Sequence, residues 1–420
     1  MSQPPTSLSR WSFLGCTDVN FSPQQEKALR ASALWLEQRK QQVFRLFGYA
    51  GTGKTTLAQE LASGAPGPVY FAAYTGKAAS VMRQRGCADA TTIHRLIYRP
   101  APKSGKLLLE LQQKLAALLK ELDESAPETA QIRQLRQLIK DEGDRVSRPS
   151  FTLNPDSPLH SAALVVIDEC SMVDEQMGLD LLSFGKPVLV LGDPAQLPPV
   201  RGEGFFTSVM PDVMLTEIHR QARDNPIIRM ASDIREGTPL RPGAEYGTSA
   251  VLQRGSFTKS LALSHDQVIV GRNATRTQFN KDYRTNVKGS KTPLPCVGDK
   301  LVCLRNNHGI GILNGELWEV TAVETPMDDK VPLALTSDDG RTVAVQAHGK
   351  IFRGEPLDWW ERKDAEEFDY GYALTCHKSQ GSQWKRVLVF DESFSFRENA
   401  RKWLYTAVTR ASESVTVIQV

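Results

Sequence analysis

The sequence contains few cysteines, and none of them forms a metal-binding pattern. Six cysteines are scattered over 420 residues without a C-x-x-C pair. This distribution argues against a zinc site or a disulfide framework and suits a reducing compartment. We therefore expect buried thiols at Cys16, Cys87, Cys170, Cys296, Cys303 and Cys376.

The sequence also lacks long apolar runs, a strong charge imbalance, internal repeats and low-complexity tracts. With no apolar run of about 18 residues and no opening signal-peptide pattern, we expect neither a membrane span nor secretion. The net charge of +3 is too small to name a partner, so any basic track for nucleic acid must be local. The length and the 40% hydrophobic content indicate a globular protein of two or three domains.

What the sequence does contain is a phosphate-binding loop. Residues 48–56 read GYAGTGKTT, after the apolar run VFRLF and before the helix-forming run LAQELA. The pattern G-x-x-x-x-G-K-[ST] between a strand and a helix predicts a loop whose backbone wraps phosphate oxygens. Lys54 is expected to reach the β- and γ-phosphates, and Thr55 to offer its hydroxyl to magnesium. The expected nucleotide contacts in this stretch are Gly48, Gly51, Thr52, Gly53, Lys54, Thr55 and Thr56.

Two later strand ends carry the polar groups that nucleotide hydrolysis requires. The run LVVIDEC places Asp168 to hold magnesium and Glu169 to polarise the attacking water. A small-molecule kinase has no need for Glu169, so this pair favours ATP hydrolysis. The following stretch PVLVLGDPAQLPPV places Gln196 on a proline-bounded loop, where it is predicted to sense the γ-phosphate. The alternative for this loop is a plain proline-rich turn.

With these motifs in this order, the chain resembles a superfamily 1 helicase of the RecD-like and phage Dda-like branch. The resemblance covers most of the chain. It also rests on FSPQQEKAL, AAYTGKAAS, TTIHRL, LTEIHRQ, YALTCHKSQGSQW and WLYTAVTRA. One departure is Gln383 and Trp384, where many relatives carry Thr or Glu followed by Phe.

The resemblance implies ATP and Mg²⁺ as cofactors, with Gln25 reading the adenine and with Gln380 and Gly381 as further nucleotide contacts. An ATP held between two lobes also needs cations from the second lobe to meet the charge developing on the γ-phosphate. Arg220 and Arg410 are the candidates for this role. The alternative for each arginine is a surface salt bridge.

A further set of residues combines hydroxyl, ammonium and imidazole donors at expected strand ends. Such donors suit phosphates and sugars and do not read base edges, as a translocase on nucleic acid requires. Single histidines are more often surface or core residues, and neither histidine here has a second ligand at metal-binding spacing. The candidate nucleic-acid contacts are Thr75, Lys77, Thr92, His94, Thr375, His377, Lys378 and Ser379.

The motif positions predict an α/β fold of two RecA-like P-loop lobes, each interrupted by an insert. The first lobe is expected at 1–97 and 160–204, with an insert at 98–159. The second is expected at 205–294 and 366–420. Its insert at 295–365 alternates like short strands and resembles the small SH3-like β-barrel that the family carries at this place.

The first insert shows a helical stripe of leucines followed by an extended stretch. The stripe, Leu108, Leu111, Leu115, Leu118 and Leu122, resumes at Ile132, Leu135 and Ile139, which predicts a helical hairpin. Its position in the family suggests a pin or wedge that separates strands, with Phe151 meeting the terminal base pair. The alternative is that the hairpin packs only on itself and the lobe, and that Phe151 fills a gap beneath it.

These observations lead us to expect an ATP-dependent, magnesium-dependent translocase that moves on single-stranded DNA and unwinds duplex and forked DNA. The 5′-to-3′ direction is implied by the resemblance alone. The alternatives are an RNA helicase and a nucleic-acid-stimulated ATPase switch that remodels complexes without unwinding. A monomer in the cytoplasm of a bacterial or phage-infected cell is expected, with replication or recombination proteins as partners and no membrane association.

Overall fold

The computed structural model describes residues 21–101, 105–121, 129–147, 150–199, 202–217, 225–307, 309–358 and 361–420. The chain forms two compact units. The first comprises Met1–Ile97, Asp156–Gly289 and Gly371–Val420. The second comprises Tyr98–Pro155 and Ser290–Tyr370, the two stretches that interrupt the first along the chain.

The first unit contains a six-stranded, wholly parallel sheet with the order β3-β2-β6-β7-β1-β8. Its central strands are near-continuous apolar runs because helices cover both faces of a parallel sheet. Along the chain the strands are β1 (Val43–Gly48), β2 (Val69–Ala73), β3 (Thr91–Thr92), β6 (Leu164–Asp168), β7 (Val188–Gly192) and β8 (Val213–Leu215). The sheet and its helices form the first lobe.

The helices of the first lobe begin where the sequence provides capping residues. Helix α1 (Pro23–Gln38) starts with a capping box in which Ser22 and Gln25 satisfy each other's backbone amides. Thr75 caps α3 (Gly76–Gln84) and Asp174 caps α7 (Glu175–Leu182). The lobe also contains α2 (Lys54–Ser63) and α4 (Ile93–Ile97).

The first unit also contains a second six-stranded sheet, with the order β17-β11-β18-β19-β10-β9. Only the β9–β10 pair is antiparallel. Its strands are β9 (Glu245–Tyr246), β10 (Ser249–Leu252), β11 (Gln267–Val270), β17 (Ala373–Thr375), β18 (Trp384–Asp391) and β19 (Ala411–Gln419). Its helices are α9 (Pro226–Glu236), α10 (Lys259–Leu263), α11 (Asn273–Asp282), α13 (Cys376–Ser379) and α14 (Ala400–Val408). These elements form the second lobe.

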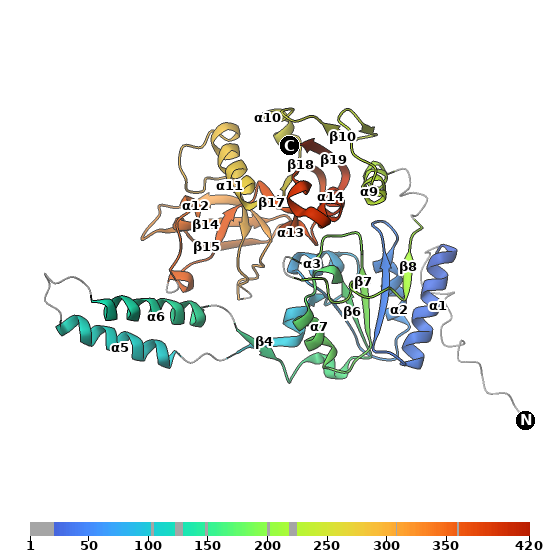
Figure 1. Cartoon of the computed structure of the whole chain (residues 1–420), viewed down its shortest axis with the longest axis horizontal. Helices are drawn as coiled ribbons and strands as arrows, with labels where there is room; N and C mark the ends of the chain where they lie inside the picture. The colour runs from blue at the N-terminus through green and yellow to red at the C-terminus, as the bar shows by residue number, and fades with distance from the viewer. Residues whose placement is uncertain are drawn as a thin grey trace, which may run out of the picture. The chain divides into compact units, whose positions relative to one another are not determined.

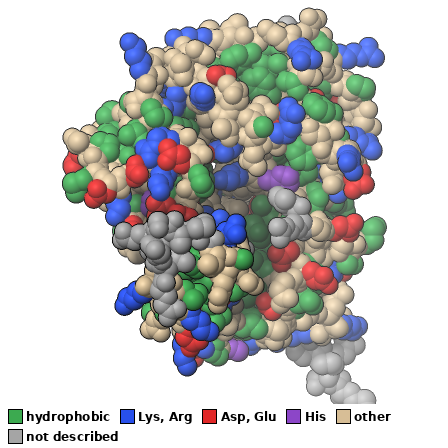
Figure 2. Space-filling view, turned by 60° about the vertical axis from the view of Figure 1, so that its left-hand side comes forward, with side chains coloured by type: hydrophobic (Ala, Val, Ile, Leu, Met, Phe, Trp, Pro, Cys, Tyr) green, Lys and Arg blue, Asp and Glu red, His purple; other side chains and the backbone are tan. Residues whose placement is uncertain are grey.

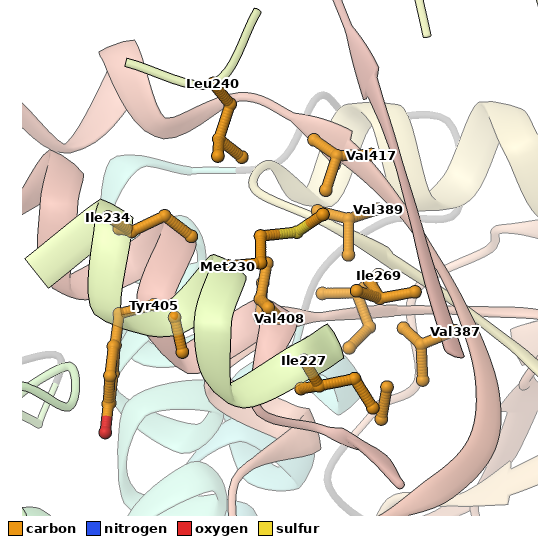
Figure 3. Packing of buried hydrophobic residues seen from close by; sticks show 14 of the residues in the cluster. Ile227, Met230, Ile234, Leu240, Ile269, Val387, Val389, Tyr405, Val408 and Val417 are labelled. Atoms are coloured by element: carbon orange, nitrogen blue, oxygen red, sulfur yellow. The ribbon is translucent and has the colours of Figure 1, made fainter. Parts of the chain in front are cut away.

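Helices α9 and α14 cover this sheet with apolar side chains. Figure 3 shows the α9 residues Ile227, Met230 and Ile234 among side chains of the strands and of α14. The same view shows the Tyr405 hydroxyl pointing away from the labelled apolar side chains. The Tyr405 ring thus packs in the apolar cluster while its hydroxyl lies outside it.

The second unit begins with a helical hairpin. Helices α5 (Lys106–Glu121) and α6 (Ala130–Ser147) pack against each other, drawn in teal in Figure 1. The described stripe residues are buried or half-buried, with Leu108 and Ile132 the most buried, so the predicted hairpin is confirmed. Leu122 lies outside the described residues. At its base, β4 (Tyr98–Pro100) and β5 (Phe151–Leu153) pair as an antiparallel ribbon. The sequence predicted the extended stretch of β5 and missed its pairing with β4.

The second unit also contains a five-stranded antiparallel sheet with the order β15-β14-β13-β12-β16. A parallel bridge between Ala347 and Glu366 joins the end of β15 to the residues before β16, so the two edge strands meet. The strands are β12 (Lys300–Cys303), β13 (Leu317–Val323), β14 (Lys330–Ser337), β15 (Thr342–His348) and β16 (Phe368–Tyr370), and the helix α12 spans Gly349–Arg353.

Two predicted boundaries are wrong because strand pairing crosses them. Strand β8 pairs with β1, so the first sheet continues past residue 204. Strand β16 pairs with β12, so the antiparallel sheet continues past residue 365 to Tyr370. Both strands are only three residues long and carry no periodic pattern of their own.

The surface matches the balanced charge of the sequence. Figure 2 shows Lys and Arg side chains dispersed among Asp and Glu side chains over the face in view. Within the described ranges, no helix is long and apolar enough to cross a membrane. The cysteines among these residues are free thiols, four of them buried and Cys296 half-buried, whereas Cys16 lies outside the described part of the chain.

Candidate nucleotide and nucleic-acid sites

The loop between β1 and α2 has backbone conformations that require glycine. Gly51 and Gly53 have φ angles of 80° and 79°, in the left-handed region that other residues rarely adopt. A side chain at Gly48 would place its Cβ 2.8 Å from the Cβ of Leu215 and 2.6 Å from the Thr52 hydroxyl. The three predicted loop glycines are therefore fixed by conformation or by close approach.

Helix α2 begins at Lys54 without a side-chain cap. The first backbone amides of such a helix point outward and favour an anion. The Lys54 ammonium lies over the loop, donating to the carbonyls of Gly48 and Tyr49 at 2.6 and 3.1 Å. Open amides and an ammonium group together make this end of α2 suitable for phosphate.

The end of β6 brings the two predicted magnesium ligands together. The Thr55 hydroxyl donates to Asp168 Oδ2 at 3.1 Å, and the backbone amide of Glu169 donates to Asp168 Oδ1 at 2.8 Å. Burial raises the pKa of Asp168, and the neighbouring Glu169 raises it further, whereas Lys54 opposes both. No group of three or more His, Cys, Asp or Glu side chains that could hold a metal ion occurs among the described residues. A divalent cation at this pair would therefore need phosphate and water oxygens to complete its shell, as Mg²⁺ commonly does.

Glu169 and Gln196 both line the same cleft as the loop. Glu169 has a left-handed backbone with φ 53°, an uncommon conformation for a residue with a side chain. Gln196 is buried, and its side-chain oxygen has no hydrogen-bond partner within the described ranges. An unsatisfied buried amide facing a cleft is available to a ligand or water.

Arg410 of the second lobe lines this cleft from the other side. Its side chain is 5% exposed and donates to the carbonyls of Thr406 and Ser382 at 3.1 and 3.3 Å. None of the ion pairs among the described residues includes Arg410, so the alternative of a surface salt bridge is excluded. A buried guanidinium without a carboxylate is suited to an anionic ligand. The other predicted arginine, Arg220, lies outside the described residues.

A contact that the sequence did not predict joins the two lobes beside the loop. The Tyr405 hydroxyl of α14 donates to Asp193 Oδ2 at 2.7 Å and accepts the Ala50 amide at 3.1 Å. Burial and the nearby Asp193 raise the pKa of Tyr405 well above 10, so the phenol keeps its proton. Burial also raises the pKa of Asp193. The available signal was the polar residue that directly follows the apolar strand VLVLG, three residues before Gln196.

Neighbouring residues extend this junction between the lobes. The Leu197 amide donates to the Thr406 hydroxyl at 2.8 Å, and its carbonyl accepts the Gln380 side chain at 2.8 Å. The Arg235 guanidinium lies 3.9 Å from the centre of the Tyr49 ring. Both the phosphate loop and the Gln196 loop therefore contact the second lobe directly.

The predicted nucleotide contacts divide into residues that line the cleft and residues that support it. The cleft has a volume of about 770 Å³. Gln25 lines it, and its side chain donates to the Thr52 carbonyl at 3.0 Å. Gly381 also lines it, whereas Gln380 is buried outside the lining. The predicted residues in the lining are Gln25, Gly51, Thr52, Gly53, Lys54, Thr55, Thr56, Asp168, Glu169, Gln196, Gly381 and Arg410.

The candidate nucleic-acid contacts of the first lobe follow β2 and β3, which are neighbouring parallel strands. The Thr75 hydroxyl accepts the Ala78 amide at 3.1 Å, and the Thr92 hydroxyl accepts the Arg95 amide at 3.2 Å. Both hydroxyls therefore also cap helices. Lys77 on α3 and His94 on α4 are half-buried.

The candidates of the second lobe lie around α13, after β17. A Cβ at Gly381 would lie only 2.7 Å from the Thr75 hydroxyl, so this segment lies against the start of α3. Burial lowers the pKa of His377, which favours its neutral form, and Lys378 is exposed. Thr375 is buried at the strand end. Ser379 is 0% exposed and donates its hydroxyl to the Cys376 carbonyl at 2.7 Å, so its predicted contact with nucleic acid is wrong.

Phe151 stands on β5 opposite Pro100. Its side chain is 43% exposed. Part of the ring is therefore open to solvent.

Comparison with known proteins identifies the family of this fold and cleft. The family model described as AAA domain matches residues 20–256, more than half of the chain. The chain belongs to the AAA domain family. A second model, UvrD-like helicase C-terminal domain, matches residues 370–418, the part of the second lobe that carries His377, Tyr405 and Arg410.

Curated relatives of this AAA domain protein include the ATP-dependent RecD2 DNA helicase of Deinococcus radiodurans. It is 28% identical over 60% of this chain and 35% of its own length. The RecBCD enzyme subunit RecD of Mycobacterium tuberculosis is 26% identical over 89% of this chain and 66% of its own length. The chain thus spans from about a third to just under two thirds of these relatives.

Among solved structures, a Pif1 helicase from a study of unwinding at forked duplex DNA covers 95% of this AAA domain protein and 92% of its own chain, with 18% identity and a TM-score of 0.52. Bacteroides Pif1 bound to single-stranded DNA gives the same coverage and identity with a TM-score of 0.51. These likenesses confirm the two-lobe α/β fold. The family models and the RecD2 and RecD relatives confirm the predicted resemblance to superfamily 1 helicases of the RecD-like branch.

Proposed function

We propose that this protein is an ATP-dependent DNA helicase that moves 5′ to 3′ on single-stranded DNA. The observation that carries the proposal is one cleft lined by the phosphate loop, Asp168 and Glu169 from the first lobe and by Arg410 from the second. A site divided between two lobes couples hydrolysis to their relative motion, because the charge on the γ-phosphate favours the arrangement in which both lobes contact it.

Each residue has a distinct role in this reaction. Lys54 and the amides of α2 bind the β- and γ-phosphates, while Glu169 orients and deprotonates the attacking water. Gln196 contacts the water or the γ-phosphate, and Arg410 stabilises the developing negative charge. Thr55 and Asp168 would hold Mg²⁺, which supplies charge neutralisation on the phosphates when bound.

The nucleic-acid path that we propose crosses the carboxyl edges of both sheets. Thr75, Lys77, Thr92 and His94 contribute from the first lobe, and Thr375, His377 and Lys378 from the second. Their hydroxyl, ammonium and imidazole groups suit the sugar-phosphate backbone, so binding is independent of sequence. The names of the RecD2 and Pif1 relatives support DNA over RNA as the track.

The second unit supplies the parts that strand separation requires beyond translocation. We assign the five-stranded sheet, whose edges meet at Ala347 and Glu366, as an SH3-like barrel, and the β4–β5 ribbon with the α5–α6 hairpin as the pin. Phe151 would stack on the terminal base pair, an interaction worth roughly 1 to 3 kcal/mol for one base. Phe151→Ala is expected to slow unwinding and to leave DNA-stimulated ATP hydrolysis unchanged. Leu109→Ala, an exposed apolar residue of α5, is the matched control.

The direct test uses duplex substrates with a single-stranded tail of defined polarity. A duplex with a 5′ tail is expected to open with ATP and Mg²⁺, whereas a duplex with only a 3′ tail is not. Stronger stimulation of ATP hydrolysis by single-stranded RNA than by DNA would favour an RNA helicase. Stimulation without opening of any duplex would favour the ATPase switch. The same assay tests the oligomeric state when the unwinding rate is measured at several protein concentrations. If the active form is a monomer, the rate increases linearly with protein concentration.

A further inference from the structure

The segment between β18 and α14 turns one phenylalanine outward and another inward. Phe394 is 62% exposed. Phe396, two residues later, stacks on Trp403 with ring centroids 5.5 Å apart and lies 5.9 Å from the ring of His377. Exposing a large apolar ring forgoes the stabilisation that burial would give. The ring of Phe394 is therefore accessible to a ligand.

A buried carboxylate fixes the base of this segment. Glu392 accepts the backbone amides of Gly271 and Arg272 at 2.7 and 3.0 Å. It also accepts Arg272 Nε at 2.7 Å and the Thr275 hydroxyl at 2.6 Å. These four bonds tie the chain after β18 to the chain after β11. Phe394 therefore lies only two residues after Glu392, whose position is fixed by these four hydrogen bonds.

A cation stands beside the exposed ring. The Arg272 guanidinium carbon lies 6.0 Å from the centre of the Phe394 ring, and the Arg272 side chain is 56% exposed. Its ion pair with Glu392 holds the guanidinium in this position while leaving part of it open to solvent. An aromatic face beside a guanidinium is the combination that proteins use to bind the bases and backbone of single strands.

The position of this pair continues the proposed nucleic-acid path. Strands β17, β11 and β18 are parallel neighbours, so the residues that follow them emerge at one edge of the sheet. His377 and Lys378 follow β17, Arg272 follows β11, and Phe394 follows β18. Phe396, which contacts His377, connects the two sets of residues directly.

We propose that Phe394 and Arg272 form a stacking platform for one base of a single-stranded nucleic acid. The inference rests on the proposed function, and it adds base stacking to a path otherwise made of backbone contacts. The ring accepts any base on its face, and Arg272 provides positive charge for the adjacent phosphate. Binding at the platform is therefore independent of sequence.

The test measures the dissociation constant of the full chain for a labelled oligothymidylate and for an abasic oligonucleotide of the same length. Phe394→Ala and Phe394→Leu are expected to weaken oligothymidylate binding about tenfold, which corresponds to about 1.4 kcal/mol. Phe394→Trp is expected to retain it, because an indole also stacks. Binding of the abasic strand and ATP hydrolysis without nucleic acid are expected to stay at wild-type values in all three variants. Met210→Ala, at an 84% exposed apolar position of the same unit, controls for removal of a surface side chain.

Wild-type affinity of Phe394→Ala for oligothymidylate would overturn the platform and leave the proposed helicase intact. Retained binding by Phe394→Leu would also overturn it, because a leucine side chain cannot stack on a base. If the wild-type chain bound neither single-stranded DNA nor RNA, the proposed function would fail together with the platform.

Discussion

The two lobes have sheets of equal size, but the turns that lead from β1 and from β11 into the next helix differ. In the first lobe, β1 leads through a glycine-rich loop to α2, whose first amides have no side-chain cap. In the second lobe, β11 leads to α11, which also has no side-chain cap, but the Glu392 carboxylate binds the amides of Gly271 and Arg272 directly before it. We call the first turn the open edge, because it can bind an external anion, and the second turn the closed edge, because it already binds an internal one.

This difference accounts for the place at which we propose the nucleotide site. At the open edge, helix amides and Lys54 converge and suit a phosphate. At the closed edge, the Glu392 carboxylate already binds the backbone amides. The second lobe contributes to the proposed site through α14, which carries Tyr405 and leads to Arg410. We expect the following substitutions to separate the two roles.

Removing the cation at the open edge should have the largest effect. Lys54→Ala is expected to lower ATP hydrolysis by more than about a thousandfold and to weaken nucleotide binding, because a preorganised charge at the phosphates is lost. The thermal midpoint should stay close to that of the wild type, since the ammonium contacts only loop carbonyls. Fluorescent-nucleotide binding and steady-state hydrolysis check this, and near-normal turnover would remove Lys54 from the site.

Removing the anion at the closed edge should lower stability and leave nucleotide binding nearly unchanged, the opposite of the result expected for Lys54→Ala. Glu392→Ala is expected to lower the free energy of unfolding by about 2 to 3 kcal/mol, because a buried charged acceptor of several hydrogen bonds is lost. Nucleotide affinity should change little. Urea unfolding measures the loss, with Glu413→Ala, in an exposed ion pair with Lys385, as a control that should change by less than about 1 kcal/mol.

The Glu392 contribution should also depend on pH. Burial raises the pKa of this carboxyl, but hydrogen bonds from Thr275, Arg272 and Gly271 outweigh burial and lower it. Because the folded pKa lies below the unfolded value, the stabilisation is complete above about pH 4.5 and is lost as the pH falls through the folded pKa. The stability difference between wild type and Glu392→Ala should therefore shrink in acid. A difference that grows in acid would contradict this assignment.

A smaller effect is expected at the contact that joins the lobes. Tyr405→Phe removes the hydroxyl that donates to Asp193 and accepts the Ala50 amide, so it should lower kcat for DNA-stimulated hydrolysis about tenfold and change KM little. Tyr405→Leu is the second variant, because it removes the aromatic ring together with the hydroxyl. The difference between Tyr405→Leu and Tyr405→Phe then gives the effect of lost packing, and the difference between Tyr405→Phe and wild type gives the effect of the lost hydrogen bonds. Equal melting temperatures for Tyr405→Phe and wild type, with unchanged kcat, would show that the contact is dispensable.

The smallest effect concerns His377. Burial lowers the pKa of this imidazole, so it stays neutral above about pH 6.5 and should contact the strand as a neutral donor. The ratio of DNA-stimulated hydrolysis in wild type to that in His377→Gln should stay constant within about twofold from about pH 8 to about pH 6.5. A ratio that rises steadily below pH 7 would indicate a charged imidazolium instead.

The phosphate loop and the two-lobe fold could be predicted from sequence because each rests on local pattern. Apolar strands followed by glycines or carboxylates mark β1 and β6, and the leucine stripe marks the α5–α6 hairpin. Predictions failed where long-range pairing decides the structure. Three-residue strands such as β8 and β16 carry no periodicity, so only their partners show which sheet they join.

Site residues were missed or misplaced for a related reason. Asp193 and Tyr405 stood inside recognised motifs, but only the fold brings them within 2.7 Å. Ser379 stood beside His377 and Lys378 in one motif, yet the turn at α13 directs its hydroxyl inward to Cys376. Neighbouring residues at the start of a helix can therefore differ in solvent exposure, as Lys378 and Ser379 do.

The central claim is that both lobes act on one nucleotide, and Arg410 tests it most directly. Single-turnover ATP hydrolysis in the presence of single-stranded DNA should fall about a thousandfold in Arg410→Ala, because the cation that meets the γ-phosphate charge is lost. Nucleotide affinity should stay within about threefold, because the first lobe supplies most ground-state contacts. Arg410→Lys should recover only part of the rate, since an ammonium lacks the forked geometry of guanidinium. Hydrolysis at the wild-type rate in Arg410→Ala would contradict the account.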